Sequence, residues 1–459
     1  MLKFDFSHCV DSRFPIFNTR EQLAARYRET EEALTTLKSQ EPGFLKILEH
    51  PEALDELLEY KPALSDFDNF VVLGIGGSAL GNTALHRSLK PFQWEFFSRE
   101  ERNGLCRVFV WDNVDPDFLH DQLWLVGLNP PSAEASKTVF NVISKSGNTA
   151  ESMALYLYVR KALEKQGLDP RKHIVFTTDP EKGILRKISR KEGFKAFSIP
   201  PEVGGRFSVL TAVGLLSALA AGIDIEKLFQ GAREAKKRLL STPVAENPAA
   251  LIALHHLLYY EKGISLSVMM AYSNALYTWA DWYRQLWAES LGKRVNRSGQ
   301  EVFVGPTPIK ALGVTDQHSQ VQLYNEGKLD KVLTFLEVES FRHRLDIPSM
   351  HPEHEGLSYL GNQKFNDLIN LELRGTEYAL TKHGRPSMRV VFPRIDETHI
   401  GEFIVTYEMA TTLMAALLDI DPFDQPGVEL GKQATYALMG RAGYDALAKE
   451  IRFAEGEDS

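Results

Sequence analysis

The chain of 459 residues is poor in cysteine, in long apolar runs and in positive charge. Its two cysteines, Cys9 and Cys106, exclude a disulfide-rich scaffold and favour a reduced, intracellular setting. Because 52 Lys and Arg face 61 Asp and Glu, the formal net charge is −9, which argues against a general binder of nucleic acids or anionic membranes. The hydrophobic fraction of 44% excludes a disordered chain, since it suffices for a sizeable core.

Segments for secretion or membrane insertion are not evident in the sequence. The N-terminal stretch carries Asp5 and Asp11 and has no continuous apolar segment, so it does not resemble a signal peptide. The strongest apolar stretch, residues 213–223, is shorter than the ~20 residues that a membrane-spanning helix requires. We therefore expect a cytoplasmic protein, with a frayed acidic tail at 456–459.

Short apolar runs of strand length alternate with helix-like stretches, such as 151–167, along most of the chain. Continuous apolar strands between helices are typical of a parallel sheet that is covered on both faces. The sequence therefore predicts two α/β domains. The expected strands are 69–75, 107–111, 138–143, 173–178 and 195–199 in the first domain, and 265–272, 331–338 and 387–393 in the second.

The domain boundaries follow from the changes in pattern along the chain. An early helix is expected to end at Pro42-Gly43, and a long helical stretch is expected over 206–222. Residues 242–250 have the composition of a hinge between domains. The prediction is a helical N-terminal segment at 1–50, α/β domains at 51–241 and 242–400, and a helical C-terminal region at 401–459 that packs back.

A glycine-rich turn, GIGGSALG, follows the first expected strand. Its glycines allow close backbone approach, and Ser78 adds a hydroxyl at a helix start, where unpaired N–H groups attract anions. The alternatives are a turn that merely packs, and a dinucleotide site, because Gly74, Gly76 and Ala79 fit G-x-G-x-x-[GA]. A dinucleotide site requires an acid about 20 positions further on. The acid that ends the next apolar run is Asp112, which is too distant and disfavours that alternative.

A second turn, SKSGNTAES, follows the strand expected at 138–143. Ser144, Ser146 and Thr149 present three hydroxyls, with Lys145 beside them, at the start of the next helix. Uncharged donors at a helix N-terminus suit a phosphate dianion and need no metal. The alternative is a hydroxyl-rich N-cap, but three hydroxyls in six residues are more than one cap requires. We therefore favour an anion site.

Arg206 lies in a third segment, GGRFS, at the expected head of an apolar helix. An arginine in this position is suited to fixing a substrate oxyanion. The alternative is a surface arginine, but the apolar stretch from Phe207 onward puts Arg206 at the edge of a buried element.

Together these segments resemble the glucose-6-phosphate isomerase (phosphoglucose isomerase) family, in family order from about residue 70 to 432. The resemblance implies two doubly wound α/β sugar-isomerase (SIS-type) domains, usually in a homodimer with active sites near the subunit interface. It also implies reversible conversion of glucose 6-phosphate to fructose 6-phosphate through a cis-enediol, in glycolysis and gluconeogenesis, without a metal or cofactor. The matching segments are GIGGSALG, NVDP, SKSGNTAES, GGRFSVLTAVGLL, QLWAESLGK, DQHSQ and FDQPGVELGK.

The resemblance also implies residue roles. Glu289 matches the base that accepts the C2 proton, and Arg206 matches the arginine that stabilises the enediolate. His318 and Lys432 match positions assigned to ring opening. The implied substrate contacts are Gly77 and Ser78 toward the sugar, Ser144, Lys145, Ser146 and Thr149 on its phosphate, and Gln425 as a hydrogen-bonding residue.

One segment departs from the family pattern. Longer members carry a glutamate shortly before Gln-His, whereas the corresponding stretch here, ALGVTDQH, has none. The base is therefore assigned to Glu289, with Asp316 as the alternative.

Three other features are interpreted as structural. The HPEHE segment at 351–355 resembles a metal cluster but lacks nearby cysteines to complete a tetrahedral set, so we expect a surface loop near the substrate or interface. His255 and His256 lie in an apolar run and are expected to be packed or interfacial, and the aromatic cluster at 277–287 is expected in the core.

Two competing functions remain at this point, a non-catalytic sugar-phosphate sensor and an isomerase of another sugar phosphate. The presence of Glu289, His318 and Lys432 in their motifs favours an enzyme over a sensor. A sensor that regulates genes would also carry a DNA-binding module, and neither the net charge nor a short N-terminal segment supplies one. The expected partner is a small sugar phosphate, with no nucleic acid and no membrane.

Overall fold

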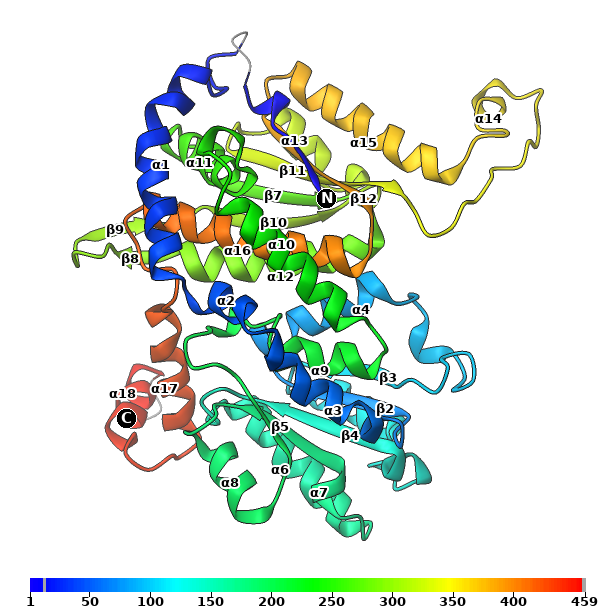
Figure 1. Ribbon diagram of the computed structural model, residues 1–459, viewed down its shortest axis with the longest axis vertical. Coiled ribbons are helices and arrows are strands. Elements are labelled where there is room, and N and C mark those ends of the chain that lie inside the picture. Colours follow the sequence, from blue (N-terminus) through cyan, green and yellow to red (C-terminus); the bar gives the residue numbers. More distant parts are fainter. Residues whose placement is uncertain (11–13, 456–459) are drawn as a thin grey trace.

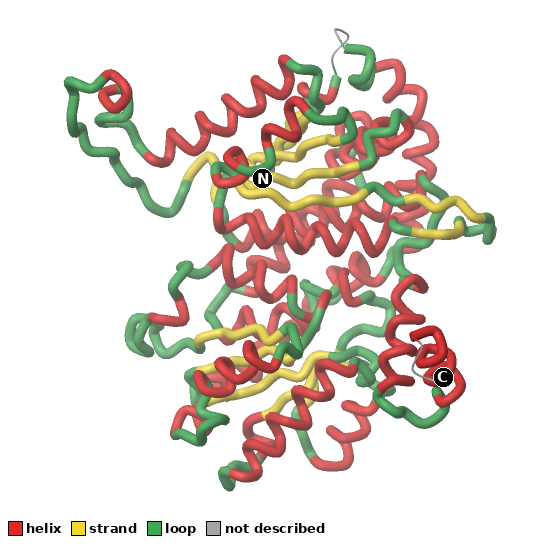
Figure 2. Tube along the Cα trace, turned by 180° about the vertical axis from the view of Figure 1, so that it is seen from behind, coloured by secondary structure: helices red, strands yellow, loops and turns green. Residues whose placement is uncertain are grey.

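The computed structural model describes residues 1–10 and 14–455. It contains two five-stranded sheets, one in each half of the molecule, with helices packed between them (Figures 1 and 2). The acidic tail expected to be frayed, and Asp11 of the N-terminal stretch, lie outside the described residues.

The first sheet is parallel throughout, in the order β3-β2-β4-β5-β6. The chain order reverses between β2 and β4, and in such sheets ligands bind beyond the carboxyl ends of the strands at this switch point. The two turns with anion-binding character follow these two strands. The bounds are β2 (Asn69–Leu73), β3 (Arg107–Trp111), β4 (Thr138–Ile143), β5 (Ile174–Thr178) and β6 (Ala196–Ser198).

The second sheet has the order β1-β12-β11-β7-β10, and only its edge strand β1 is antiparallel to its neighbour. The strands β1 and β10 were not expected from the sequence, and a short antiparallel hairpin, β8–β9, precedes β10. The N-terminal segment is therefore not purely helical. The bounds are β1 (Lys3–Asp5), β7 (Leu266–Ala271), β8 (Lys293–Val295), β9 (Glu301–Val304), β10 (Thr307–Leu312), β11 (Lys331–Ser340) and β12 (Ser387–Arg394).

Helices connect the strands and cover both faces of each sheet (Figure 1). The predicted fold class, two doubly wound α/β domains, is confirmed by this topology. The bounds are α1 (Arg20–Gln40), α2 (Gly43–Lys46), α3 (Asp55–Leu64), α4 (Leu80–Leu89), α5 (Pro116–Leu125), α6 (Ala150–Lys165), α7 (Pro170–His173), α8 (Ile184–Glu192), α9 (Ala212–Ala220), α10 (Ile225–Leu239), α11 (Pro248–Glu261), α12 (Asn274–Leu291), α13 (Val321–Glu326), α14 (Glu355–Ser358), α15 (Phe365–Lys382), α16 (Glu397–Leu417), α17 (Glu429–Leu438) and α18 (Asp445–Glu455).

One continuous core joins the two sheets. Alternate residues of β2 illustrate its origin: Phe70 and Val72 point into the shared core, whereas Val71 and Leu73 pack into a separate cluster on the other face. Side chains of β7 and β11 complete the shared core from the second sheet, through residues such as Met269. Helices α10, α12 and α16 lie between the sheets (Figure 1).

The helix α16 corrects the expectation that residues 213–223 are the most membrane-like stretch. At 21 residues and a mean hydropathy of 1.2, α16 is long and apolar enough to cross a membrane by composition alone, but 89% of its most apolar window is buried in the protein. It is therefore the central core helix. The boundary proposed at 400/401 falls inside it, while the other domain boundaries remain predictions.

Two further expectations differ from the structure. The stretch 206–222 is not one helix, because a short 3-10 turn, η7 (Gly205–Phe207), and a loop precede α9. Residues 242–250 do not form an exposed hinge: they form η8 (Val244–Glu246) and the start of α11, and both Val244 and Asn247 are buried. The amide of Asn247 caps α11 and thereby stabilises this connection.

The expectations for the histidine pair and the aromatic cluster are confirmed. Burial lowers the pKa of His255 to about 3 and that of His256 to about 4, so both are neutral and packed. Four of the aromatic residues at 277–287, Trp279, Trp282, Tyr283 and Trp287, are buried in the core. The two cysteines are free and buried in different places, with the thiol of Cys9 on the carbonyl of Ser387 and that of Cys106 on the carbonyl of Phe67.

A buried charge cluster ties β1 to the second sheet. The carboxylate of Glu377 on α15 lies 3.4 Å from Nε of Arg389 and 3.8 Å from Nε2 of His8, and Arg389 also pairs with Asp5 and Glu337. Burial raises the pKa of Glu377 to about 7, the charge of Arg389 opposes this rise, and the charges of Asp5 and Glu337 add to it. Glu377 is thus a proton-binding group near neutral pH.

We expect the replacement Glu377→Gln to flatten the pH dependence of stability. Because the folded pKa of about 7 exceeds the reference value of 4.5, Glu377 contributes stability that is complete below pH 4.5 and lost as the pH rises through 7. The loss is on the order of 3 kcal/mol in the free energy of unfolding. Denaturant titrations between pH 4.5 and 8 measure it, with the exposed Glu59→Gln as a control for the change in net charge. Parallel pH profiles for wild type and Glu377→Gln would contradict this assignment.

Candidate active site

The turn after β2 packs closely against η7, and the space at Gly77 admits only a glycine. A Cβ on Gly77 would lie 2.3 Å from the carbonyl carbon of Gly205 and 2.7 Å from the amide nitrogen of Arg206. Gly76, which precedes it in η4 (Gly76–Ser78), has a positive φ of 59°. The glycines therefore bring the first turn and Ser78 directly beside Arg206.

The turn after β4 carries the three predicted hydroxyls. Ser144 and Thr149 share a hydrogen bond of 2.9 Å between their hydroxyl oxygens, and Ser144 Oγ accepts the N–H of Gly147 at 3.1 Å. The hydroxyl of Ser146 accepts the N–H of Asn148 at 3.2 Å. Although Thr149 occupies the N-cap position of α6, its side chain caps no N–H of that helix. The hydroxyls thus organise a turn in front of an uncapped helix N-terminus, which argues against the simple N-cap alternative.

The ammonium of Lys145 is held by backbone carbonyls of a neighbouring loop. Its ammonium donates to the carbonyls of Pro201 at 2.5 Å and Val203 at 2.9 Å, in the loop that leads to η7. Burial lowers its pKa. In this structure Lys145 therefore ties the second turn to the segment that carries Arg206, and its assignment to the phosphate remains a prediction.

Arg206 is buried at the junction of three segments. Its Nε donates to Ser290 Oγ at 2.8 Å and its Nη1 to Gln425 Oε1 at 2.9 Å, and Nη1 lies 3.3 Å from Glu289 Oε1. Its Nη2 donates to the carbonyls of Pro422 and Asp424. Burial lowers the pKa of the guanidinium, while the carboxylates around it act in the opposite direction. The group is a fixed cation with its orientation set by α12 and residues 422–425.

Glu289 lies on the last turn of α12 and remains partly open to solvent, with 27% of its side chain exposed. One carboxylate oxygen faces Arg206, and the other accepts a hydrogen bond of 3.1 Å from Gln285 Nε2. The Gln285 amide also lies beside Gly76 of the first turn. Glu289 is therefore a held carboxylate beside a fixed cation, the pair that base catalysis with oxyanion stabilisation requires.

Lys293 belongs to the site although it was assigned no role from the sequence. Only 5% of its side chain is exposed, and its ammonium donates to the carbonyl of Glu289 at 3.2 Å. It also contacts Asp424, at 2.5 Å to the carbonyl and 2.8 Å to the carboxylate. Lys293 thus links the C-terminal end of α12, which carries Glu289, to the segment that carries Gln425. The sequence contains a signal for this role, because Lys293 is the last residue of the segment QLWAESLGK, which matches the family.

The C-terminal segment packs against the second turn and η7 of the candidate active site. The ring of Phe423 lies 5.4 Å from that of Phe207, and the hydroxyl of Tyr436 on α17 donates to the carbonyl of Asn148 at 3.1 Å. Lys432 precedes Tyr436 by one helical turn and therefore lies on the same face of α17. Its ammonium is exposed and pairs with Glu429 at 2.7 Å. The structure thus places Lys432 beside the second turn, without a described contact to Glu289.

His318 lies apart from the other predicted catalytic residues. Helix α12 runs antiparallel to β10, because Asp281 pairs with Lys310 at 3.0 Å and Gly292, just after α12, lies against Gly305, just before β10. Glu289 therefore faces the start of β10. His318 lies in η9 (Thr315–His318), beyond the other end of that strand. A strand of this length separates the two residues by roughly 20 Å. His318 is exposed and does not join Glu289 within one chain.

Asp316 shares the remote position of His318. Its carboxylate accepts the N–H of Leu312 at 2.7 Å and the hydroxyl of Ser319 at 2.5 Å. Although burial acts to raise the pKa of Asp316, these hydrogen bonds hold it below the usual value. Both carboxylate oxygens of Asp316 already accept hydrogen bonds within this loop, which argues against Asp316 as the base.

The HPEHE segment forms part of an arm that protrudes from the second domain around α14 (Figure 1). Its potential ligand atoms, on His351, Glu353 and His354, lie within 4.8 Å of one another and are exposed. The segment is on the surface, as expected, and is not part of the cluster around Arg206.

Comparisons with known proteins identify the family. The family model described as Phosphoglucose isomerase matches residues 61–344 and 374–447. The glucose-6-phosphate isomerase of Carboxydothermus hydrogenoformans is 46% identical over 460 residues, which cover 98% of this chain and 97% of that protein. The chain belongs to the phosphoglucose isomerase family. The resemblance predicted from the sequence motifs is therefore confirmed, and the chain is an isomerase.

Solved structures of similar shape agree with membership of the phosphoglucose isomerase family. The crystal structure of a hypothetical protein from Thermus thermophilus superposes with a TM-score of 0.81 at 35% identity, covering 96% of this chain and 100% of that chain. The crystal structure of a glucose-6-phosphate isomerase from Chlamydia trachomatis gives a TM-score of 0.73 at 24% identity, covering 88% of this chain and 76% of that chain, and thus shows the shared fold.

We expect Lys293→Met to lower kcat/KM by roughly tenfold to a hundredfold. The reason is that loss of the ammonium leaves Asp424 unpaired and frees the end of α12, so Glu289 and Gln425 lose their relative position. Steady-state kinetics with glucose 6-phosphate measure the effect. The matched control is Lys310→Met, which removes an ion pair from the other half of α12. Equal losses in both variants would mean that α12 is merely destabilised.

Proposed function

We propose that this member of the phosphoglucose isomerase family interconverts glucose 6-phosphate and fructose 6-phosphate with Glu289 as the base. The observation that carries the proposal is the carboxylate of Glu289 held 3.3 Å from the buried guanidinium of Arg206, at the mouth of the two turns. An ionised carboxylate beside a fixed cation favours removal of a proton next to a carbonyl, because the cation stabilises the developing oxyanion.

The reaction needs only proton transfers. Once the sugar ring is open, Glu289 takes the C2 proton, the C2–H electron pair forms the C1=C2 double bond, and the carbonyl electrons move to O1. The product is a cis-enediolate, which becomes the cis-enediol when O1 takes a proton. Arg206 and Gln425 stabilise the oxygen that carries the developing charge. Glu289 then returns a proton to C1 while the C2 hydroxyl gives up its proton and becomes the carbonyl. This O2 proton replaces the one that O1 took up, so the atoms balance and there is no net oxidation.

The phosphate is assigned to the turn after β4. Its hydroxyls from Ser144, Ser146 and Thr149 and the N-terminal amides of α6 form a cradle of donors. We assign Gly77 and Ser78, in the turn after β2, to the sugar. Strong binding of the remote phosphate orients the reacting carbons against Glu289 and thereby accelerates the chemical step.

We also assign the chain to a homodimer in which each site receives His318 from the partner subunit. His318 is too remote from Glu289 to serve the same site, and the helices beside it carry exposed apolar side chains. Leu323 on α13 is 57% exposed, and Leu371 and Tyr378 on α15 are 60% and 67% exposed. The loop of His318 is anchored to α15, since Gln317 Nε2 donates to Thr376 Oγ1 at 2.8 Å. An exposed apolar surface next to a remote catalytic residue favours an interface there.

Lys432 is assigned, with His318, to opening of the sugar ring, from its place beside the phosphate turn. The buried free thiols of Cys9 and Cys106 are consistent with a reduced compartment, and we assign the protein to the cytoplasm. No metal or nucleotide is included in the proposed site.

The test of the base is hydrogen exchange at C2. Purified protein should form fructose 6-phosphate from glucose 6-phosphate, and Glu289→Gln should reduce kcat by about 10³-fold while largely sparing substrate binding. The variant should also stop exchange of the C2 hydrogen with deuterated solvent, measured by NMR, whereas Asp316→Asn should retain it. Normal exchange in Glu289→Gln would refute this role for Glu289.

The dimer is tested by mixing two inactive variants. We expect Glu289→Gln and His318→Ala each to be inactive alone and, after dissociation and reassociation together, to recover about a quarter of wild-type activity. The reason is that half of the dimers are mixed, and each of these contains one intact site. Failure to recover activity, with mixed dimers demonstrated by mass spectrometry, would show that His318 serves its own chain or none.

A further inference from the structure

A second cavity lies at the opposite end of the first sheet from the candidate active site. It has a volume of about 490 Å³ and is lined by residues next to the amino ends of β2 and β3 and by Trp124 and Leu125 at the end of α5. The turns of the active site follow the carboxyl ends of the same strands. The length of a five-residue strand therefore separates the two sites by at least roughly 16 Å.

Cations outnumber carboxylates in this cavity. Arg99, Arg102 and Arg107 line it together with Asp68 and Glu134. Three positive charges of the lining therefore face two negative ones, and Lys137, outside the lining, lies 3.7 Å from Glu134. In a chain of net charge −9, this concentration of positive charge is local. A local positive surplus favours an anion such as a phosphate monoester.

The arginines are held in place and still have donors to offer. Arg102 is 3% exposed and is fixed by the carbonyls of Phe97 and Leu105. Burial and the charge of Arg107 lower the pKa of Arg102. Arg107 donates its Nε to Asn69 at 2.7 Å and one Nη2 hydrogen to Glu134 at 3.2 Å. A guanidinium has five N–H donors, so Arg107 retains others that contact no described residue.

An aromatic ring stands beside this charge. Trp124 lines the cavity with 64% of its surface exposed, although indole rings are normally largely buried. Stacking of a planar base on such a ring contributes binding energy that does not depend on a specific hydrogen-bond pattern. The hydroxyls of Ser98 and Ser132 lie in the same lining.

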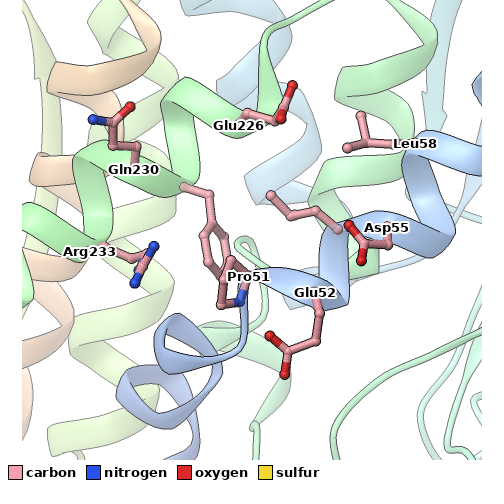
Figure 3. Close-up of a pocket in the computed structure, with 9 residues that line it drawn as sticks. Pro51, Glu52, Asp55, Leu58, Glu226, Gln230 and Arg233 are labelled. Carbon is pink, nitrogen blue, oxygen red and sulfur yellow. The ribbon is translucent and has the colours of Figure 1, made fainter.

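Another cavity of the protein does not combine a positive surplus with an aromatic ring that could stack on a base. The cavity of about 390 Å³ between α10 and the segment of η3 (Pro51–Leu54) and α3 is lined by Glu52, Asp55 and Glu226 against Arg233 (Figure 3). Three carboxylates against one cation repel a phosphate. Cations exceed carboxylates in the arginine cavity and also in the cavity lined by Lys38, Arg233, Lys236 and Lys237. Among the described residues, the lining of that other cavity contains no aromatic ring, so the combination of positive charge with Trp124 distinguishes the arginine cavity.

We propose that the arginine cavity binds a phosphorylated ligand with a planar base, that is, a nucleotide, at a site separate from the active site. The phosphate pairs with Arg107, Arg99 and Lys137, and the base stacks on Trp124. Arg102 supplies a buried positive charge behind the phosphate.

Calorimetry with adenosine 5′-monophosphate on the full chain tests the proposal. We expect binding to wild type, with Kd raised at least about tenfold by Arg107→Gln and by Trp124→Ala, and nearly restored in Trp124→Phe. Tyr158→Ala, which removes an aromatic ring that is 50% exposed on α6, should leave the affinity unchanged. Adenosine and inorganic phosphate, used as separate probes, should each bind more weakly than the nucleotide at this cavity.

The active-site variant Ser144→Ala/Thr149→Val separates this proposal from the proposed function. It should lose the sugar phosphate and keep the nucleotide, whereas Arg107→Gln should keep normal isomerase turnover. Loss of nucleotide binding in the active-site variant, equal affinity for adenosine, or no binding up to roughly 10 mM would each overturn the proposal. The folding of every variant is checked by its thermal unfolding.

Discussion

The buried guanidinium of Arg206 is the interaction on which the rest of the site depends. With 2% of its side chain exposed, this cation is stable only because acceptors surround it. Those acceptors come from α12, through Ser290 and Glu289, and from residues 422–425 near the C-terminal end. The close contact of Gly77 with Gly205 fixes the turn that carries the arginine. The site therefore forms only when both α/β halves and the C-terminal segment have come together.

The parts of the fold and site that were predictable have strong local signals. Strands β2, β4 and β5 are buried on both faces, so they read as continuous apolar runs with sharp ends. The hydroxyl-rich turn after β4 was visible because glycine and hydroxyl residues cluster between such a run and a helical pattern. These features depend on neighbours in the sequence, and the sequence therefore displays them.

The features that were missed depend on residues far apart in the chain. Strand β10 is an edge strand with mixed composition, and β1 has three residues that gain a strand only by pairing with β12. The distance between His318 and Glu289 is set by the direction in which α12 crosses β10. The role of Lys293 rests on a contact with Asp424, 131 residues later. Motif matching groups such residues together, but only the topology shows which of them share a site.

The single core that runs through both halves has a consequence for how small molecules enter. Separation of the two sheets would expose a large apolar surface to water. The free-energy cost is too high for this to occur in every turnover. Helix α17 is instead held on the second turn by the hydrogen bond from Tyr436 to Asn148, and most of its side chains are exposed. Of the segments that border the site, α17 is thus the one whose displacement would expose the least apolar surface, while residues 422–425 stay fixed on Arg206 and Lys293.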